Sequence, residues 1–357
     1  MKRLQEIYIR SADPFERGRQ HGSQVVERIH SICKNYMDSF AAKGYTWEEA
    51  KEMAMEYYPL LKEQMPDLLM EAEGIATGAG IDLATVLVLN TRYELLKFPK
   101  KQDGSPEHEC TVYCITPDAT AQKETLAGQN WDNAPFIGEN LYVLHIDEEN
   151  GTKIVGLCEP AQLIRNGMNS HGLSLSCATL LSTLDKPGIA IPSTFLRRRL
   201  LQCKTLEEAE ALITSFKPYV SLSYSMASRQ GEAFLYETNP GENYKIYPTA
   251  GILAHGNDFV VNPLIERFIP ADNHHVHHFR GQRLGYLLGK KRGSIDEFTI
   301  IESLADHEGF PGSICDHTTD EGYMTIASTI YCLNRGYALI CWGRPCQGVE
   351  YFELYNL

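Results

Sequence analysis

The residues of this chain best suited to covalent chemistry are its thiols, and one thiol stands at an unusual position. Cys110 opens an apolar, alternating segment, CTVYCI (110–115), and directly follows a polar run, KKQDGSPEHE (100–109). Because that run carries Gly and Pro among charged residues, it is typical of an exposed loop. None of the ten cysteines forms a C-x-x-C pair, so neither a zinc motif nor a redox motif explains a cysteine at this junction.

Cys110 can act as a nucleophile if the chain is cut just before it. A thiol reacts as the thiolate or beside a base, and the nearest candidate base, His108, lies on the far side of such a cut. Breaking the Glu109–Cys110 bond frees an α-amine with an ordinary pKa of about 8, which can serve as the base. The thiol can make the cut itself by attacking the Glu109 carbonyl, forming a thioester that water resolves. The alternative is a buried strand cysteine without chemistry, and spacing alone does not choose between the two.

Composition and charge narrow the classes of partner. A chain of 357 residues allows one large or two modest domains. The net charge of −13 argues against nucleic acid and against an anionic membrane surface, because both attract basic faces. We find neither a signal-peptide pattern nor a run near the roughly 20 apolar residues of a membrane span. We therefore expect a soluble, cytoplasmic protein with reduced cysteines.

The first hundred residues predict helices. Apolar residues at steps of three and four form one stripe: Val25, Ile29, Ile32, Tyr36 and Phe40. Thr46 and Glu49 have the spacing of a capping box, which predicts that another helix begins there. Pro59 and Pro66 predict breaks between the later helices.

From Cys110 onward the pattern changes to short β-type runs separated by turn residues. These runs include LYVLHI (141–146), AFLYET (233–238), YALICW (337–342) and EYFELY (350–355). Three helices interrupt them, at 193–203, at 205–215 with the capping box Thr205/Glu208, and at 294–307 with the capping box Ser294/Glu297. Sequential strands with segregated helices predict an α+β fold in which helices cover antiparallel sheets.

Seven short motifs, read in order, resemble those of a known family. They are PFERGRQHG (14–22), LNTRYE (89–94), CTVYC (110–114), GQNWD (128–132), NSHG (169–172), HGND (255–258) and SIC (313–315). Their order and spacing are similar to those of the isopenicillin N acyltransferase family, which belongs to the self-processing N-terminal-nucleophile cysteine hydrolases. The resemblance runs over nearly the whole chain, and LNTRYE, then CT, then GQNWD is a specific combination.

The resemblance implies a fold and a processing site. The fold would be an αββα four-layer sandwich with antiparallel sheets, forming a single domain over residues 1–357. Cleavage between Glu109 and Cys110 would leave a helical chain of residues 1–109 and a strand-rich chain of residues 110–357. The two chains would stay folded together as a heterodimer.

The resemblance also implies roles for three catalytic residues. Cys110 matches the self-processing nucleophile of the family. Asp132 matches an acidic residue that hydrogen-bonds near the nucleophile and its amine, and Asn257 matches the side chain that polarises the reacting carbonyl. An amide N–H aimed at a developing oxyanion contributes a few kcal/mol to the transition state, so the roles are physically consistent.

Three further residues are candidates for substrate binding. Arg92 in NTRYE could pair with Asp132 or with the substrate, while Trp131 could stack on the substrate but more ordinarily packs. Tyr323 falls where the fungal members have an arginine near the substrate, which argues against a penicillin substrate. Glu109 stands where those members have Gly, a change that cleavage should tolerate because this residue contributes only its carbonyl.

We therefore predict an enzyme that transfers acyl groups through a thioester on Cys110, with no metal or redox cofactor. The acceptor would be water, as in an amide hydrolase, or a small amine that receives its acyl group from acyl-CoA. The first alternative is an unprocessed, non-catalytic binding protein with the same fold.

A metal-dependent hydrolase is the second alternative, because NHHVHHF (273–279) places His274 and His278 four residues apart. No H-E-x-x-H arrangement accompanies that run. We expect a solvated loop that leads into a surface helix, RGQRLGYLL (280–288). The basic stretch Arg197–Arg199 is likewise expected to be a solvated helix face, or else a contact for the phosphates of acyl-CoA.

Overall fold

The chain divides into two compact units in the computed structural model. The model describes residues 4–101, 110–149, 151–261, 263, 277–310, 312–317 and 322–347, with the backbone alone at 277 and 278. The first unit comprises Met1–Ser105, Glu139–Ser170 and Lys186–Gln202, and the second comprises Pro106–Gly138, His171–Asp185 and Cys203–Leu357. The chain changes from one unit to the other five times, and one of these changes falls within a short helix, α7 (Pro135–Asn140). Among the described helices, none is both long and apolar enough to cross a bilayer.

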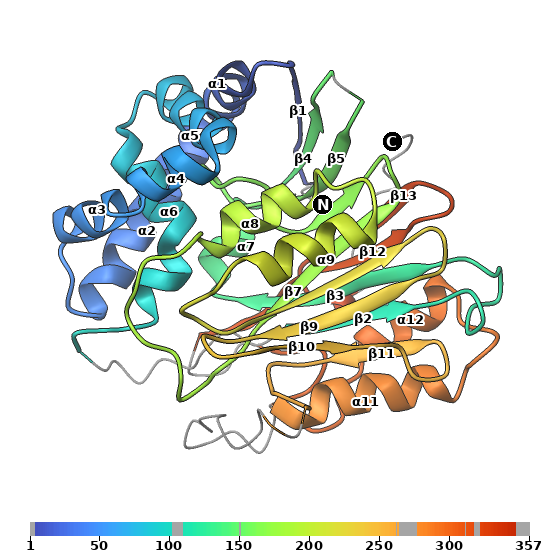
Figure 1. The fold of residues 1–357 in the computed structure, drawn as a ribbon. Coiled ribbons are helices and arrows are strands. Elements are labelled where there is room, and N and C mark those ends of the chain that lie inside the picture. Colours follow the sequence, from blue (N-terminus) through green and yellow to red (C-terminus); the bar gives the residue numbers. More distant parts are fainter. Residues whose placement is uncertain are drawn as a thin grey trace. The chain divides into compact units, whose positions relative to one another are not determined.

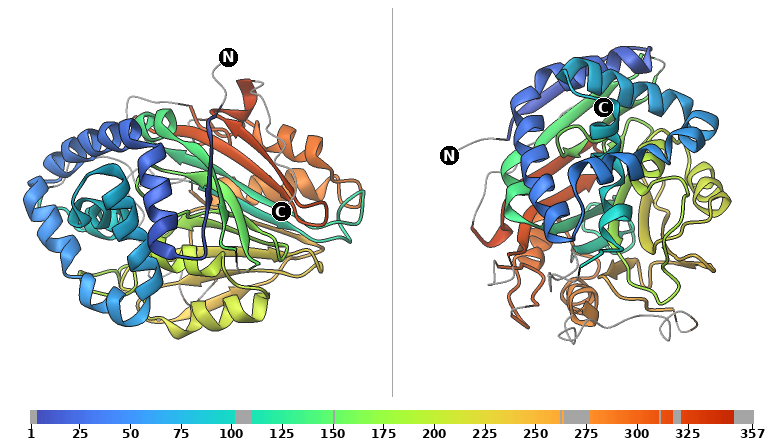
Figure 2. Two further views of the ribbon diagram at one scale, coloured as in Figure 1. Left: turned by 90° about the horizontal axis from the view of Figure 1, so that it is seen from above. Right: turned by 90° about the vertical axis from the view of Figure 1, so that its left-hand side faces the viewer.

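The first unit combines a small sheet with seven helices among its described residues (Figures 1 and 2). The strands lie in the order β1 (Glu6–Arg10), β4 (Tyr142–Asp147), β5 (Lys153–Cys158) and β6 (Gly167–Asn169). The helices are α1 (Pro14–Gln24), α2 (Val26–Ala42), α3 (Trp47–Met55), α4 (Tyr58–Gln64), α5 (Pro66–Ala79), α6 (Leu83–Leu96) and α8 (Ser193–Leu200). The predicted apolar stripe is buried along α2. Helix α3 begins with the predicted capping box of Thr46 and Glu49.

Helices α1 and α5 contact each other through their backbones. A Cβ atom added to Gly18 would lie 1.9 Å from the carbonyl oxygen of Glu71, and one added to Gly74 would lie 2.1 Å from that of Phe15. Gly22 and Gly78 repeat this close approach one turn further along each helix. Any side chain at these positions would force the two helices apart.

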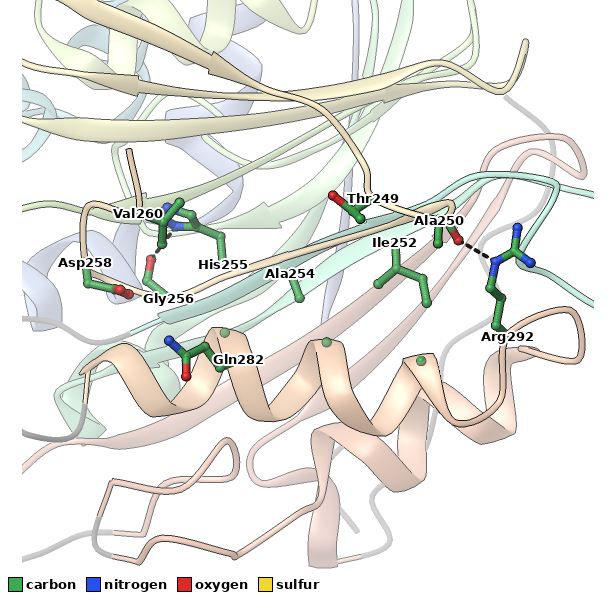
Figure 3. A pocket seen from close by; sticks show the side chains of 13 residues that line it. Thr249, Ala250, Ile252, Ala254, His255, Gly256, Asp258, Val260, Gln282 and Arg292 are labelled. Atoms are coloured by element: carbon green, nitrogen blue, oxygen red, sulfur yellow. Dashed lines mark hydrogen bonds between the residues drawn. The ribbon is translucent and has the colours of Figure 1, made fainter. Parts of the chain in front are cut away.

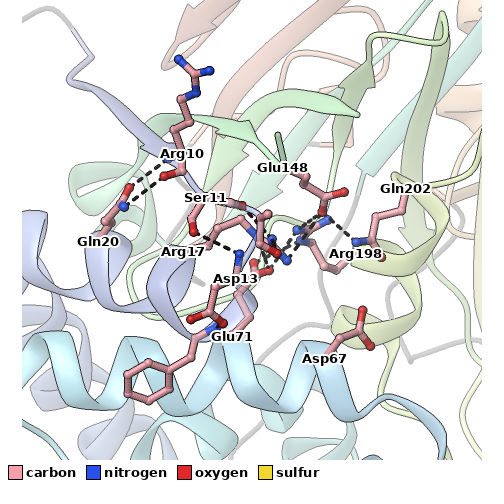
Figure 4. A network of polar contacts seen from close by, with 12 residues as sticks. Arg10, Ser11, Asp13, Arg17, Gln20, Asp67, Glu71, Glu148, Arg198 and Gln202 are labelled. Carbon is pink, nitrogen blue, oxygen red and sulfur yellow. Dashed lines mark hydrogen bonds and ion pairs between the residues drawn. The ribbon is translucent and has the colours of Figure 1, made fainter. Parts of the chain in front are cut away.

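A buried ion-pair network joins α1 and α5 to α8 (Figure 4). Arg198 is fully buried, and its Nη2 lies 3.0 Å from Oε2 of Glu71 and 2.6 Å from Oε1 of Glu148. Nε of Arg17 donates to Glu71 at 3.2 Å. The solvated face predicted for Arg197–Arg199 is therefore wrong at Arg198, and Arg197 is buried as well. The carboxylates that compensate Arg198 come from distant segments, which the pattern of one helix does not reveal.

The second unit contains two stacked antiparallel sheets with helices outside them (Figure 1). One sheet has the order β7 (Leu173–Thr179), β8 (Leu222–Ser228), β9 (Ala233–Thr238) and β10 (Asn243–Ile246). The other has the order β11 (Ile252–His255), β2 (Cys110–Ile115), β3 (Leu126–Asn133), β12 (Met324–Cys332) and β13 (Tyr337–Trp342). The helical elements are α9 (Leu206–Ser215), α11 (His277–Gly289), α12 (Glu297–Leu304) and the short 3₁₀ helix η1 (Pro345–Gln347).

Successive side chains of a strand point to opposite faces of its sheet, and their contacts show the order of the sheets and helices in the second unit. On β9 the hydroxyl of Tyr236 donates to Glu210 of α9, whereas its neighbour Glu237 contacts His255 on the other sheet. On β2, Sγ of Cys114 lies 3.2 Å from Oγ of Ser225 in β8. The two residues that flank Cys114 on β2, Tyr113 and Ile115, point to the opposite face and pack with leucines of α11 and α12. The second unit is thus a helix–sheet–sheet–helix stack, and the predicted αββα sandwich is confirmed there.

The structure differs from the predictions at one strand and at one helix cap. Strand β8 was not predicted, because its alternating serines resemble a polar turn. Those serines face the space between the sheets, where Oγ of Ser223 donates to the carbonyl of Ala178 at 3.1 Å. Helix α12 is capped by Asp296, whose carboxylate accepts from the N–H of Thr299, and not by Ser294. The predicted run EYFELY (350–355) lies outside the described residues.

Gly18→Ala tests the backbone contact between α1 and α5. In a free helix alanine is the more favourable residue, but here its Cβ would meet a carbonyl oxygen. We expect the free energy of unfolding to fall by about 1–3 kcal/mol, measured by denaturant titration. Ser23→Ala, at an exposed position of the same helix, is the control and should change stability by under about 0.5 kcal/mol. Equal stability of the two variants would contradict the contact.

Candidate active site

Sheet register places Asn257 beside the backbone nitrogen of Cys110. Strands β11 and β2 are antiparallel with His255 opposite Val112, so two residues further along Asn257 comes opposite Cys110. Oδ1 of Asn257 accepts a hydrogen bond from the N–H of Cys110. Both residues are buried. The structure therefore brings together two of the three predicted catalytic residues.

The carbonyl of Thr179 fixes the orientation of the Asn257 amide. Nδ2 of Asn257 lies 2.9 Å from the carbonyl oxygen of Thr179 and 2.8 Å from its Oγ1. A carbonyl oxygen can only accept, so the amide nitrogen must face Thr179 and the amide oxygen must face Cys110. Thr179 ends strand β7, so Asn257 links that strand to Cys110 on the other sheet of the second unit.

Asp132 lies close to Cys110 along the sheet but faces the opposite side. Its neighbour on β3, Trp131, pairs with Cys110, so alternation turns the Asp132 carboxylate toward α11. There Asp132 forms a fully buried ion pair with Arg280, whose Nη2 lies 3.3 Å from Oδ2 of Asp316. One guanidinium thus contacts two buried carboxylates.

Arg280 is a residue that sequence reasoning missed. It was assigned to a surface helix, whereas the structure buries it completely. The next residue makes this position possible, since a Cβ on Gly281 would lie 2.9 Å from the backbone nitrogen of Gly256. Glycine lets α11 approach the end of β11 and so brings Arg280 over the sheet. An arginine followed by glycine at the start of a helix was the available signal.

A second buried pair stiffens the segment around Asn257. Nε2 of His255 lies 2.8 Å from Oε1 of Glu237, which also accepts from the N–H of Val260 at 2.7 Å. Burial lowers the pKa of His255, but the hydrogen bond and charge of Glu237 outweigh it and raise that pKa overall. The residues on either side of Asn257 are therefore anchored to β9.

A groove of about 610 Å³ runs between β11 and α11 (Figure 3). It extends from His255 and Gly256 at one end to Arg292 at the other. Ile252 and Ala254 form one wall and pack on the α11 side of the sheet. The side chain of Cys110 faces the other side of that sheet by alternation, so we assign the groove no part in acyl transfer.

The remaining predicted residues have other surroundings. Arg92 belongs to the first unit, where its guanidinium pairs with the buried carboxylate of Glu159 and lies over the ring of Tyr36. Trp131 is buried, and Tyr323 is half-buried just before β12. A substrate contact stays a prediction for all three.

Several predicted residues cannot be placed. Glu109, the residue before the proposed cut, lies outside the described residues. So do His274 and His275, and at His277 and His278 the backbone of α11 alone is described. The processing site and the histidine run therefore remain predictions from the sequence.

The sequence is similar to one known family and to one characterised relative. The family described as acyl-coenzyme A:6-aminopenicillanic acid acyl-transferase matches residues 119–347. The 40 kDa form of acyl-coenzyme A:6-aminopenicillanic-acid-acyltransferase from Emericella nidulans is 28% identical over 308 residues, which are 85% of this chain and 82% of the relative. The match to the family begins after Cys110 and includes Asp132 and Asn257.

Two solved structures are weakly similar. A variant of conjugated bile acid hydrolase from Clostridium perfringens has a TM-score of 0.46 and 15% identity, covering 69% of this chain and 97% of its own. Penicillin V acylase from Agrobacterium tumefaciens has a TM-score of 0.40 and 14% identity, covering 66% and 82%. Likeness at this level says nothing about chemistry. The family match spans more than half of the residues, and the chain therefore belongs to the acyl-coenzyme A:6-aminopenicillanic acid acyl-transferase family.

Proposed function

We propose that this chain is a self-cleaving cysteine amidohydrolase or acyltransferase whose nucleophile is Cys110. The observation that carries the proposal is the hydrogen bond from the Cys110 N–H to Oδ1 of Asn257. This nitrogen is the atom that cleavage before Cys110 would turn into a free α-amine. Because Asn257 already contacts it, the amine would be held beside its own thiol as soon as it formed.

The cut would run in two steps. Sulfur bonds to the carbonyl carbon of Glu109 while the peptide C–N bond breaks and the nitrogen takes up the thiol proton, which leaves a thioester and an amine. Water then attacks the thioester, releases the carboxyl group of Glu109 and restores the thiol. Later turnovers repeat both steps on a substrate: the sulfur takes the acyl group as a thioester while the substrate's amine or CoA leaves with the thiol proton, and water or an amine then removes the acyl group and restores the thiol.

Asn257 would act first as a positioning residue for the amine. Its two amide hydrogens point to the two oxygens of Thr179, so polarising a carbonyl, the role implied by family resemblance, would compete with these contacts. Its oxygen can accept from the neutral amine and so orient the nitrogen lone pair toward the thiol proton.

The buried pair of Asp132 and Arg280 would hold the neighbouring strand in place. Arg280 joins β3 to α11, and through Asp316 to the segment that precedes β12. Because Trp131 on β3 pairs directly with Cys110, a displacement of β3 would move the nucleophile. We infer that Asp132 acts in catalysis by fixing this geometry.

The acceptor distinguishes the two forms of the proposed reaction. The relative from Emericella nidulans is named for acyl transfer from acyl-coenzyme A to 6-aminopenicillanic acid. The resemblance sets Tyr323 where the fungal members have an arginine, so we propose a different small amine, or water, as the acceptor. Arg92 and Trp131 remain candidates for contacting that substrate.

Cys110→Ala should abolish processing. The wild-type chain is expected to yield two fragments, residues 1–109 and 110–357, which stay together through native chromatography as a heterodimer. The variant should give one species of 40.2 kDa in an intact-mass measurement, because the attacking sulfur is gone. Cys114→Ala is the matched control, since that thiol is buried four residues along the same strand. Fragmentation that persists in Cys110→Ala would rule out self-cleavage by this thiol, and an unfragmented, inactive wild type would support a binding protein instead.

Asn257→Ala should slow turnover more than Thr179→Val. The first change removes the group that holds the amine, and we expect kcat to fall by about 10²-fold, the lower end of what a positioned general base contributes. The second change removes one of the two acceptors that orient Asn257, so about a tenfold loss is expected. Intact mass measures processing in each variant separately from steady-state rates. Equal activity of Asn257→Ala and wild type would contradict the assigned role.

Partition of the acyl-enzyme would separate hydrolase from transferase. Processed protein is incubated with acyl-CoA donors or simple N-acyl amines, while released CoA and free amine are followed. We expect turnover of at least one class, and a transferase should form new amide in proportion to added amine. Turnover of both classes by Cys110→Ala would show that the thioester is not on the path.

A further inference from the structure

Four side chains with metal-binding atoms meet elsewhere in the second unit. They are His307, Cys315, His317 and Cys346, here called the His2Cys2 cluster, and one ligand atom from each lies within 4.8 Å of the others. Three of them come from the segment between α12 and β12, and the fourth from η1. The acyl-transfer chemistry proposed above uses none of them.

The spacing of the donor atoms is close to that of a tetrahedral zinc ion. Zinc bonds of about 2.0–2.3 Å separate tetrahedral donors by roughly 3.3–3.8 Å. Nε2 of His317 lies 2.9 Å from Nε2 of His307, 3.5 Å from Sγ of Cys346 and 4.0 Å from Sγ of Cys315. Shifts of about 1 Å or less would therefore bring all four atoms onto one ion.

Hydrogen bonds already hold the ligand-bearing segments in place. The N–H of Cys315 donates to the carbonyl of Asp306 at 3.1 Å, and the hydroxyl of Ser313 donates to the carbonyl of Cys315 at 2.7 Å. His307 is exposed whereas Cys315 is fully buried. An ion can thus enter from solvent and be enclosed on its inner side.

We propose that the His2Cys2 cluster binds one Zn²⁺ as a structural site. Two thiolates and two imidazoles are a donor set that zinc favours, and four protein ligands leave no open position for a reacting water. Binding would release the two thiol protons and join η1 to the segment that precedes β12. The site does not depend on the proposed acyl transfer.

Arg344 sets the strength of this site. Its Nη1 lies 2.9 Å from Nδ1 of His317, and a guanidinium only donates, so in the metal-free chain Nδ1 accepts. If Nε2 of the neutral His317 ring binds zinc, the ring proton is on Nδ1. That N–H would then point at the N–H of Arg344, which is also a donor. Arg344 must therefore move away on binding, and an acceptor in its place would favour the ion.

The ion would also support the candidate active site. Asp316 stands between two ligands, Cys315 and His317, and its carboxylate contacts Arg280. Its backbone is tied to β12, since the N–H of Thr325 donates to the Asp316 carbonyl at 3.1 Å. Fixing the two flanking residues on one ion would hold that carboxylate against Arg280.

Titration of the metal-free, full-length chain with Co²⁺ tests the site, because tetrahedral cobalt with thiolate ligands absorbs visible light. We expect one equivalent to bind and Zn²⁺ to displace it. Cys346→Ser and His307→Ala should each weaken cobalt binding by at least about 100-fold, more than the loss of an outer contact. His307 is exposed, so His307→Ala should keep its circular dichroism spectrum and melting temperature in the absence of metal.

Two further variants sharpen the test. Arg344→Gln should tighten binding about tenfold, because the amide oxygen can accept from Nδ1–H of His317. The double variant His274→Ala/His278→Ala removes the other histidine pair and should leave binding unchanged. The proposal fails if no cobalt binds, if binding survives both ligand substitutions, or if Cys315 and Cys346 form a disulfide in a chain that takes up no metal after reduction.

Discussion

The register between β2 and its two neighbours is the constraint on which the rest of the site depends. Val112 lies opposite His255 in β11. Two residues after His255, Asn257 therefore lies beside Cys110 and accepts a hydrogen bond from its backbone nitrogen. On the other side Trp131 lies opposite Cys110. A slip of one residue would turn the thiol to the α11 side and bring Gly256, which has no side chain, to its nitrogen. The residues beside Cys110 are therefore determined by the pairing of the backbones.

Helices and strands whose signals come from neighbouring residues could be predicted from the sequence. The apolar stripe of α2, the cap at Thr46 and the alternating run that begins at Cys110 each depend on residues close together in the chain, and all three are present. Strand β8 shows where this reasoning stops. The hydroxyl of Ser223 donates to the carbonyl of Ala178 on the neighbouring strand, and the hydroxyl of Ser225 contacts Cys114 on the other sheet. These partners are distant in sequence, so no local pattern reveals them.

Buried charge was the least predictable property of the chain. Arg198 and Arg280 both stand in stretches that resemble solvated helix faces, yet each is fully buried between carboxylates. The partners lie 127 residues away for Arg198 and Glu71, and 148 residues away for Arg280 and Asp132. Such pairs depend on tertiary proximity, since a buried arginine without its carboxylates would be strongly destabilising. Cys110 and Asn257 could be named as candidates from the motifs, whereas Arg280, which pairs with Asp132, could not.

The three glycines of α11 differ in the space around them. Gly281 touches the main chain of β11 and has no room for a methyl group, whereas Gly285 meets only the Cβ of Ala254 at 3.8 Å and Gly289 meets nothing within 4 Å. Both of the latter glycines line the 610 Å³ groove, so a methyl group there would border the groove without meeting the backbone of another element. The fold thus offers two places where the lining of this groove can change while the close contact at Gly281 is kept.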